Sequence, residues 1–555
     1  MSDQPLFVFP SSPNAAAIEW PGTPIGVSNT ITRTKGRTAV HDKTIDRTPG
    51  KRDALVASVE KHMAAHPDER VYQHDVVIHG IRVRAQTNSA HLFDFWVTNW
   101  FGVDEWLEIT GQTPSADPQV MVYAFGGVES EPEAAYYSRA TNTVIFFNTS
   151  YYGQLKSWVL GAVGRVLAEV YGIHSVHGAC VEKNARGILY IAPTGTGKST
   201  SSYGLMDYPN TRFHSDDWVY IRYTVATRDG RRIAPVTIHD GAAEIHGYHC
   251  FRWLETNASR KDARINALTL DNTPLDLTVG ELDFSKPREA YAYTSEKVFY
   301  LRSNIVENFP LAACELLHST FENVPDLTPP FREQFARLMR TSADAALAAD
   351  AQAGCGFLAE QPRAMVEEQM GRLAAFDNAR AMLRIENVFA AARCYVNPLE
   401  PVKVRTVFLL KRNFGQDDVL ESLDQAQFLT RLMIGLTPDG KKETAYNAYR
   451  AVDDAEERAF INALEQESES RRVPLYDLYR ASRNIPETLY EEFELFRVLH
   501  SATRDYHLNT ILTKDPRNTT KAEAVRETME LIAQTADREP RDVSLTIQDY
   551  RGLIA

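Results

Sequence analysis

The sequence predicts a two-lobed α/β protein that carries a helical insertion and a helical C-terminal region. Short apolar runs of strand length alternate with segments of helical spacing through the first half of the chain. Between about Arg332 and Asn387 the composition shifts to Ala, Glu, Met and Arg, which favours a helical insertion over about residues 310–390. From Asp453 to the end, charged amphipathic segments of helical spacing dominate. We therefore expect an N-terminal lobe over residues 1–150, a second lobe over 151–455 and a helical region over 456–555.

Length, charge and cysteine content narrow the class of protein. At roughly 150 residues per domain, 555 residues correspond to three or four structural units. The 60 basic and 73 acidic side chains give a net charge of −13, which argues against a protein that coats nucleic acid. No apolar run approaches the roughly 20 residues needed to cross a bilayer, and the first residues do not resemble a secretory signal. The five cysteines lie far apart without a C-x-x-C pair, which fits a reducing cytoplasm. Together these features predict a cytoplasmic protein that binds neither nucleic acid nor a membrane. They do not predict its oligomeric state.

The N-terminal lobe is expected to mix helices and strands. Residues 1 to about 30 are rich in Pro, Ser, Asn and Gly without periodicity, which predicts an irregular arm. The elements predicted after this arm are, in order, a helix over Lys51–His66, short strands within Arg70–Arg84, a helix over Ala90–Phe101, strands at Val120–Tyr123 and Thr143–Asn148, and a helix over Gln154–Val170. The second lobe is expected to begin near that last helix.

The second lobe opens on an apolar strand, Gly187–Ala192, which runs into a glycine-rich turn and a helix from Lys198. Thr211–Tyr223 is expected to be a strand that carries two carboxylates, and Val404–Leu410 is expected to be a further buried strand. The Ala-rich and Glu-rich segment between about Arg332 and Asn387 is the predicted helical insertion.

The strongest local signal follows the first strand of the second lobe. Ala192–Thr200 reads Ala-Pro-Thr-Gly-Thr-Gly-Lys-Ser-Thr and matches the end of the phosphate-loop pattern G-x-x-x-x-G-K-[ST], with Ala192 where the first glycine is expected. In such a loop the glycines let backbone N–H groups turn toward phosphate oxygens, the lysine reaches the β and γ phosphates, and the serine hydroxyl coordinates Mg²⁺. The predicted nucleotide-binding residues are Thr194, Gly195, Thr196, Gly197, Lys198, Ser199 and Thr200. The alternative is a glycine-rich turn that only caps a helix.

Two adjacent carboxylates, Asp216 and Asp217, follow this loop after a short interval. Carboxylates at a strand end close to a phosphate-binding turn can hold a divalent cation that bridges nucleotide and substrate. An Asp-Asp pair alone is more typical of a solvated turn, but the neighbouring loop favours the cation site.

The order of motifs in this region resembles a known family. The series is Tyr-Gly-x-x-Lys156, a helix, Gly172-Ile-x-x-x-His177, a strand, Gly-Thr-Gly-Lys-Ser and Asp-Asp. It is similar to the series of motifs in ATP-type phosphoenolpyruvate carboxykinases and, from His177 onward, to that in HPr kinases. The resemblance implies the two-lobed carboxykinase fold, ATP as the phosphoryl donor, Mn²⁺ held by Lys156, His177 and Asp217, and Ser199 on the Mg²⁺ of the nucleotide. A lysine ligates a metal only as the free amine, so its pKa must fall several units from roughly 10.4. Taken singly, Lys156 would be a surface charge and His177 a core histidine.

Weaker likenesses extend the resemblance. Thr34–Lys43 resembles the carboxykinase segment Gly-Arg-Ser-Pro-Lys-Asp-Lys, which implies that Arg37 grips a substrate carboxylate; the alternative is a loop cation. The resemblance also makes Arg393, with Arg302 as its rival, the candidate for the arginine that contacts the transferred phosphoryl group. Glu244-Ile-His-Gly resembles the metal-associated Glu-Ile-Arg-Gly of HPr kinases, which implies a metal role for Glu244. The chain departs from the carboxykinases in having no clear Thr-Glu-Asn-Thr-Arg or Glu-Gly-Gly-Cys-Tyr-Ala-Lys segment.

These residues lead to one expected function and two alternatives. We expect phosphoryl transfer that depends on ATP and a divalent metal, with conversion of oxaloacetate to phosphoenolpyruvate and CO₂ as the specific hypothesis. In that reaction Lys198 and Arg393 would neutralise charge on the γ-phosphoryl group. The first alternative is a kinase for a hydroxyl of another small molecule or of a protein serine, with Asp216 or Asp217 as the base. The second is a nucleotide-binding regulatory protein with a degenerate site, whose C-terminal helices bind partners. The partner is thus a small carboxylate-bearing substrate, an unidentified hydroxyl acceptor or another protein.

Overall fold

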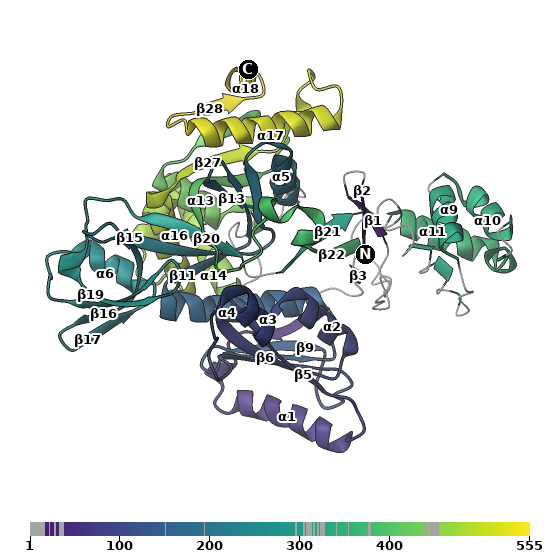
Figure 1. Cartoon of the computed structure of the whole chain (residues 1–555), viewed down its shortest axis with the longest axis horizontal. Coiled ribbons are helices and arrows are strands. Elements are labelled where there is room, and N and C mark those ends of the chain that lie inside the picture. The colour runs from purple at the N-terminus through teal and green to yellow at the C-terminus, as the bar shows by residue number, and fades with distance from the viewer. Residues whose placement is uncertain are drawn as a thin grey trace.

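The computed structural model has the mixed α/β architecture that the sequence predicts, with two large sheets of seven and fourteen strands (Figure 1). The structure describes residues 17–20, 23–26, 29–32, 38–149, 151–193, 195–294, 297–303, 306, 313–314, 317–318, 321, 328–339, 341–352, 355–375, 379–436, 442–443 and 454–555. Within these residues, no helix is both long enough and apolar enough to span a membrane.

The seven-stranded sheet is built by the N-terminal part of the chain. Its strands are β4 (Val40–Asp42), β5 (Tyr72–Ile78), β6 (Ile81–Thr87), β7 (Phe101–Gly102), β8 (Val120–Phe125), β9 (Ala134–Ser138) and β10 (Thr143–Phe147), in the spatial order β4-β9-β10-β8-β6-β5-β7. The helices of this part are α1 (Lys51–Ala65), α2 (Ala90–Asn99) and α3 (Val103–Thr110). In β6 the alternate residues Ile81, Val83 and Ala85 are buried, because successive side chains of a strand point to opposite faces.

Helix α4 (Tyr152–Tyr171) lies between the two sheets (Figure 1). It is buried nearly all round, which is typical of a central helix rather than of an amphipathic surface helix. Trp158 of α4 shares one core cluster with Phe146 of the small sheet and Tyr220 of the large sheet. The helix ends at Gly172, whose φ of +62° is a left-handed conformation that glycine adopts without strain. Helix α4 is thereby packed against both sheets.

The fourteen-stranded sheet forms the larger part of the molecule. Its strands are β11 (Ile173–Val176), β12 (Gly178–Lys183), β13 (Arg186–Ile191), β14 (Thr211–Ser215), β15 (Val219–Ala226), β16 (Arg232–Asp240), β17 (Ala243–His246), β18 (Arg264–Thr269), β19 (Pro274–Thr278), β20 (Glu289–Thr294), β23 (Val402–Lys411), β24 (Asp418–Ser422), β27 (Arg504–Asn509) and β28 (Ser544–Thr546). The helices around it are α5 (Lys198–Gly204), α6 (His249–Asn257), α12 (Ile385–Val388), α13 (Gln425–Met433), α14 (Asp454–Arg471), α15 (Leu475–Ala481), α16 (Glu487–Ala502), α17 (Lys521–Arg538) and α18 (Arg551–Ile554).

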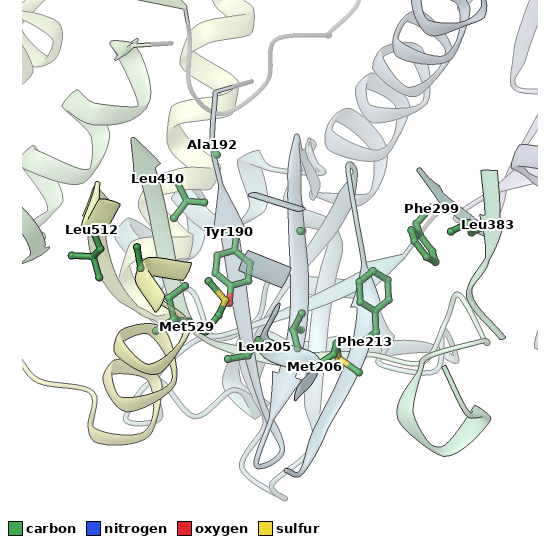
Figure 2. Packing of buried hydrophobic residues seen from close by; sticks show 14 of the residues in the cluster. Tyr190, Ala192, Leu205, Met206, Phe213, Phe299, Leu383, Leu410, Leu512 and Met529 are labelled. Carbon is green, nitrogen blue, oxygen red and sulfur yellow. The ribbon is translucent and has the colours of Figure 1, made fainter. Parts of the chain in front are cut away.

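Strand β13 lies in the middle of the largest core cluster. Its residues Ile188 to Ile191 are fully buried, as expected for an apolar run covered on both faces. Tyr190 packs in one cluster with Leu410 of β23 and Met529 of α17, and Figure 2 shows Phe213 of β14 farther along the same layer. The strand that leads into the glycine-rich loop is therefore held rigidly by its neighbours.

The predicted irregular arm is wrong for the part that the structure describes. Residues of this arm form β1 (Ala17–Trp20), β2 (Thr23–Gly26) and β3 (Asn29–Thr32). The first two strands pair with each other, and β3 adds to a three-stranded sheet with β21 (Val298–Ser303) and β22 (Ala379–Arg384). Local composition did not indicate β3, because its hydrogen bonds go to a strand some three hundred and fifty residues away in the sequence.

Two more regions refine the sequence expectations. Helices α9 (Pro329–Met339), α10 (Ala343–Gln352) and α11 (Arg363–Ala375) occupy the predicted insertion, between the paired strands β21 and β22. The C-terminal region contains the expected helices, but it also supplies β27 and β28 to the large sheet. β27 alternates polar and apolar residues (Arg-Asp-Tyr-His-Leu-Asn), so no apolar run marked it as a strand. A short pair, β25 (Gly435–Leu436) and β26 (Lys442–Glu443), completes the strands of the described residues.

Candidate active site

Three parallel strands bring the candidate site to one edge of the large sheet. β13 and β27 both run parallel to β23, so the carboxyl ends of all three strands meet at one edge. The glycine-rich loop follows β13, Arg412 follows β23, and Thr510 follows β27. Arg412 Nε donates to Thr510 Oγ1 at 3.1 Å, and Thr510 Oγ1 donates to the backbone oxygen of Thr196 at 2.7 Å. The loop is thus tied to the ends of two strands that lie far away in the sequence.

The glycine-rich loop depends on its glycines for its shape. Gly195 and Gly197 have φ angles of +82° and +105°, which side chains rarely allow. A Cβ atom at Gly197 would lie 3.1 Å from Arg412 Nη2, so a side chain there would also push the guanidinium aside. The Thr196 hydroxyl donates to the backbone oxygen of Pro193 at 2.8 Å and stabilises the loop from within. Helix α5 begins at the next residue after Gly197, as the phosphate-loop pattern predicts.

Asp217 lies at the centre of the site. Its Oδ2 accepts a hydrogen bond from Lys156 Nζ at 2.8 Å, and its Oδ1 accepts one from Lys198 Nζ at 3.2 Å. His177 Nε2 lies 3.1 Å from the same Oδ1 and 3.4 Å from Lys198 Nζ. The structure therefore brings together the three predicted Mn²⁺ ligands and the lysine of the phosphate loop, although they come from α4, the turn after β11, the turn after β14 and α5.

Electrostatics set the protonation of this cluster. Removal from bulk water would by itself raise the pKa of Asp217, but the ammonium groups of Lys156 and Lys198 outweigh it and hold that pKa well below its ordinary value. Burial and the charge of Lys198 lower the pKa of His177, so its imidazole is neutral at neutral pH. A carboxylate and a neutral imidazole are donors that divalent metals accept, so this donor set fits a divalent cation.

The two carboxylates lie in a turn and not within one strand, which corrects the expectation for Thr211–Tyr223. β14 ends at Ser215 and β15 begins at Val219, because β14 pairs with β12 whereas β15 pairs with β11 and β20. Asp217 adopts a φ of +75°, a conformation that is uncommon for residues other than glycine. This tight turn points both carboxylates toward the glycine-rich loop.

Asp216 faces the loop from the other side. Tyr203 OH donates to its Oδ2 at 2.5 Å, and Ser199 Oγ lies 3.4 Å from its Oδ1. A serine hydroxyl and a carboxylate that face each other are oxygen ligands of the kind that Mg²⁺ accepts.

Lys156 is a buried residue of the first turns of α4, which excludes the interpretation as a surface charge. Its side chain is 7% exposed, and its Nζ lies 4.1 Å from the centre of the Tyr300 ring. Two residues earlier, Gln154 Oε1 accepts the backbone N–H of Thr38 at 3.0 Å. The start of α4 thus connects the cluster around Asp217 with the segment that the resemblance assigns to substrate binding.

Some predicted residues fall outside the description or away from the site. Arg37, Thr194 and the side chain of Arg302 lie outside the described residues. Arg393 donates to the backbone oxygen of Met206 and, at 2.8 Å, to Thr211 Oγ1, at the end of β14 opposite to the carboxylates. The structure therefore does not bring Arg393 to the site, because the short η5 turn (Ala391–Arg393) docks against the start of β14.

Glu244 is also away from the site. It lies in β17, exposed, and its carboxylate is within 3.3 Å of His239 and 3.6 Å of His246. The residue that follows β17, Gly247, packs against the backbone of Glu169 near the C-terminal end of α4. Since α4 rises about 1.5 Å per residue, this end lies roughly 20 Å from Lys156. The likeness to the HPr kinase motif thus does not correspond to a shared position in the site.

A cavity of about 600 Å³ opens over the cluster. It is lined by the glycine-rich loop, the start of α4, both carboxylates, Arg412 and Lys521. Four cationic side chains but only two carboxylates face it, although the whole chain is acidic. A second cavity of about 500 Å³ adjoins it, shares Gly197 and Arg412, and has mainly apolar walls that include Phe414.

Sequence reasoning missed two of these cations, Arg412 and Lys521. Arg412 stands directly after the apolar run of β23, and its position could have been inferred by treating β23 as parallel to β13. Burial lowers the pKa of Arg412, but an arginine remains charged, and no carboxylate of the described residues forms an ion pair with it. Lys521 begins α17, and only the packing of that helix on α5 brings it to the cavity.

Comparison with known proteins adds no family to these observations, since the sequence matches no protein-family model and no curated protein sequence.

Proposed function

We propose that this protein transfers the γ-phosphoryl group of ATP, with a divalent metal, in a two-lobed fold of the phosphoenolpyruvate carboxykinase type. One observation carries the proposal: Lys156, His177 and Lys198 converge on the carboxylate of Asp217 beside a glycine-rich phosphate loop. The cavity above them has an excess of positive charge, which suits a polyphosphate.

The two adjoining cavities support a nucleotide. The phosphates would lie along the loop, where Gly195 and Gly197 leave the backbone N–H groups accessible. The base would enter the second cavity, whose walls are mainly apolar and where the half-exposed ring of Phe414 offers a face for stacking. The volume of each cavity lies in the range that is usual for small-molecule and cofactor sites.

The charge on the phosphoryl group would be neutralised by Lys198 and Arg412. The sequence assigned the second role to Arg393, but Arg412 is the arginine that lines the cavity. Its guanidinium is already held by Thr510 at 3.1 Å, so it needs little rearrangement on binding.

The state of Asp217 favours an acceptor that needs no general base. A good base has a pKa near the working pH, whereas two ammonium groups hold the pKa of Asp217 well below its ordinary value. Loss of CO₂ from oxaloacetate breaks a C–C bond and leaves its electron pair as an enolate. The enolate oxygen can then attack the γ-phosphorus as ADP leaves, with no proton to remove. His177 and Asp217, joined by Lys156 once its ammonium group has lost a proton, would hold the divalent cation, which would supply positive charge for the enolate.

A coupled assay tests this proposal. Purified protein with Mn²⁺, Mg²⁺, ATP and oxaloacetate is expected to form phosphoenolpyruvate, and Lys198→Ala is expected to lower the rate about 10³-fold. Lys514→Ala is the matched control, because that lysine pairs with Asp417 outside both cavities. If ATP binds but no phosphoenolpyruvate forms, the carboxykinase reaction is excluded, and a hydroxyl acceptor becomes the better proposal.

Arg37 separates these two acceptors. A carboxykinase is expected to lose most of its turnover at saturating ATP in Arg37→Ala, because the arginine would grip the substrate carboxylate. A kinase that recognises its acceptor elsewhere would change little.

A further inference from the structure

The helical insertion contains a second cluster of side chains that can bind a metal, far from the glycine-rich loop and the candidate active site. One ligand atom each from His318, Asp350 and Cys355 lies within 4.8 Å of the others. The side chains of His318 and Asp350 are completely buried, and Cys355 is partly exposed. Figure 1 shows the helices of this insertion, α9 to α11, gathered at one end of the molecule, well away from the large sheet.

The hydrogen bonds of His318 leave one ring nitrogen directed at a carboxylate. Its Nδ1 lies 2.8 Å from the backbone oxygen of Cys314, which can only accept, and 3.8 Å from the Cys314 thiol, so the shorter contact places a hydrogen on Nδ1. Its Nε2 lies 3.2 Å from Asp350 Oδ1. In a neutral ring Nε2 then has a lone pair that faces the negative oxygen. A protonated carboxyl group could donate to this lone pair. Burial alone would raise the pKa of Asp350, but the hydrogen bonds from His318 and Leu358 outweigh it and lower that pKa, which favours the carboxylate. The contact is then favourable if the ring is charged or if a cation lies between the two atoms.

A cation is the better solution in these surroundings. The His318 ring lies 5.4 Å from the ring of Phe335 and stacks on that of Phe357 at 6.2 Å, and the side chains of His318 and Asp350 are themselves completely buried. Burial of an isolated ion pair is costly. A divalent cation with a carboxylate, a thiolate and a neutral imidazole has no net charge, so burial penalises it much less.

The arrangement around the cluster also matches a metal site. Metal-binding histidines commonly donate their other N–H to a backbone oxygen, as His318 does. Asp350 Oδ2 accepts the backbone N–H of Leu358 at 2.9 Å, which orients its other oxygen toward His318. Bonds of about 2.0–2.3 Å to a tetrahedral zinc ion separate its ligand atoms by about 3.2–3.8 Å, which small movements of these side chains would reach.

Another group of possible metal ligands in this protein differs from the His318 cluster, because its carboxylates already have cationic partners. Asp418, Glu421 and His507 form a second group of possible ligands, but Lys411 and Arg431 already pair with the two carboxylates at 2.6 and 2.7 Å. Among the described residues, no lysine or arginine forms an ion pair with Asp350.

We propose that His318, Asp350 and Cys355 bind a divalent cation of the zinc class, which holds the helical insertion together. Binding would release the thiol proton of Cys355, while His318 keeps the hydrogen on Nδ1 and binds through Nε2. The partly exposed Cys355 offers the route of entry and leaves the fourth position open to water. The cation would link the segment around His318 to Asp350 of α10 and to Cys355 after that helix, and such a link would stabilise the insertion.

The test measures metal in the full-length protein. After gel filtration, elemental analysis is expected to find near-stoichiometric zinc, and Cys355→Ser is expected to lower its affinity more than about tenfold. Cys394→Ser is the matched control, because that buried thiol contacts only backbone oxygens. Absence of zinc from the folded wild-type protein, even after incubation with zinc, would overturn the proposal, as would full retention by Cys355→Ser.

Cobalt identifies the ligands directly. Wild-type protein loaded with Co²⁺ is expected to show a thiolate-to-cobalt charge-transfer band, and so is Asp217→Asn, because no cysteine lines the cavity of the candidate active site. The band is expected to vanish in Cys355→Ser. A band that persists there, or one lost in Asp217→Asn, would contradict the assignment.

Discussion

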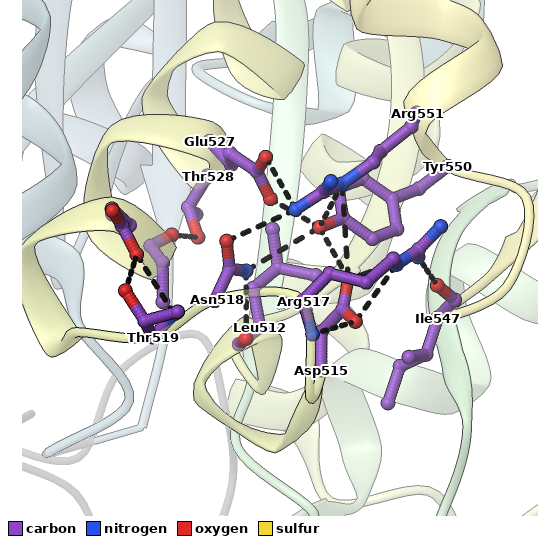
Figure 3. A network of polar contacts seen from close by, with 12 residues as sticks. Leu512, Asp515, Arg517, Asn518, Thr519, Glu527, Thr528, Ile547, Tyr550 and Arg551 are labelled. Atoms are coloured by element: carbon purple, nitrogen blue, oxygen red, sulfur yellow. Dashed lines mark hydrogen bonds and ion pairs between the residues drawn. The ribbon is translucent and has the colours of Figure 1, made fainter.

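Asp217 and Asp515 are both carboxylates that accept hydrogen bonds from cationic side chains, but their surroundings differ. Asp515 is 1% exposed and accepts Arg517 Nε at 2.9 and 3.1 Å and Tyr550 OH at 2.8 Å (Figure 3). The Arg517 hydrogen bonds lower its pKa to about 2. The side chain of Asp217 is 31% exposed, toward a cavity, and its partners include two flexible lysines. A ligand can replace the partners of Asp217, whereas those of Asp515 are fixed by the fold.

Loss of Lys198 is expected to separate function from stability most strongly. Lys198→Ala removes the ammonium group that would meet the γ-phosphoryl group, and turnover is expected to fall about 10³-fold. Its removal also relieves the crowding of positive charge beside Lys156, so the free energy of unfolding is expected to change by less than about 0.5 kcal/mol. Steady-state kinetics and chemical denaturation measure the two effects. A large loss of unfolding free energy together with the loss of turnover would show that the cluster is structural, like the network of Asp515.

Arg412 provides the next test of the same contrast. Arg412→Ala is expected to lower kcat about 10²-fold, because the guanidinium would stabilise charge that develops on the phosphoryl group. Arg405→Ala is the control, since Arg405 lies in β23, the strand directly before Arg412, and pairs with Glu539 away from the cavity. Kinetics at saturating ATP distinguish this from weaker binding alone. Unchanged kcat in Arg412→Ala would remove Arg412 from the proposed chemistry.

The sequence predicted the parts of the site that follow one another closely in the chain. The phosphate loop, its helix and the adjacent carboxylates are encoded by local patterns, because glycine conformations and strand ends have local signatures. Lys156 and His177 required the family resemblance, since a single lysine or histidine has no local signature of a ligand. The predicted contact of both with Asp217 is present in the structure.

The remainder depends on long-range topology, which local patterns do not encode. Arg412 and Thr510 reach the loop only because β23 and β27 lie parallel to β13. Arg393 and Glu244 matched family motifs in order, but their side chains lie elsewhere. Because their pairing is long-range, β3 has the local sequence of an irregular arm, and β27 lies in a stretch whose local sequence favours helices.

Asp515→Asn is expected to give the reverse of the Lys198 result. The substitution weakens hydrogen bonds between charged partners, so the protein is expected to lose about 2 kcal/mol of stability at neutral pH. Because the folded-state pKa is depressed from 3.8, the contribution is present at neutral pH and is lost as the pH falls through about 2. Affinity for ATP, measured by calorimetry, is expected to stay unchanged, since Asp515 lines neither cavity. A loss of ATP binding in a folded variant would contradict the structural role.

His79 is a buried ionisable group that lines neither of the two cavities described above, and its substitution is expected to have the smallest effect. Among the described residues, neither of its ring nitrogens has a hydrogen-bond partner, and it packs 5.2 Å from the Tyr220 ring. Burial and then the charge of Arg222 lower its pKa well below 6.5, so the folded protein keeps it neutral while the unfolded chain takes up a proton below about pH 6.5. Stability is therefore expected to fall as the pH drops below that value, by at most about 1.4 kcal/mol per pH unit from this residue. His79→Asn, which tolerates the φ of +49°, is expected to reduce the slope without removing it, because burial also lowers the pKa of His507, to about 4. Denaturation at about pH 7.5 and about pH 5.5 measures the difference in slope, and identical slopes for variant and wild type would show that His79 is accessible to protons in the folded state.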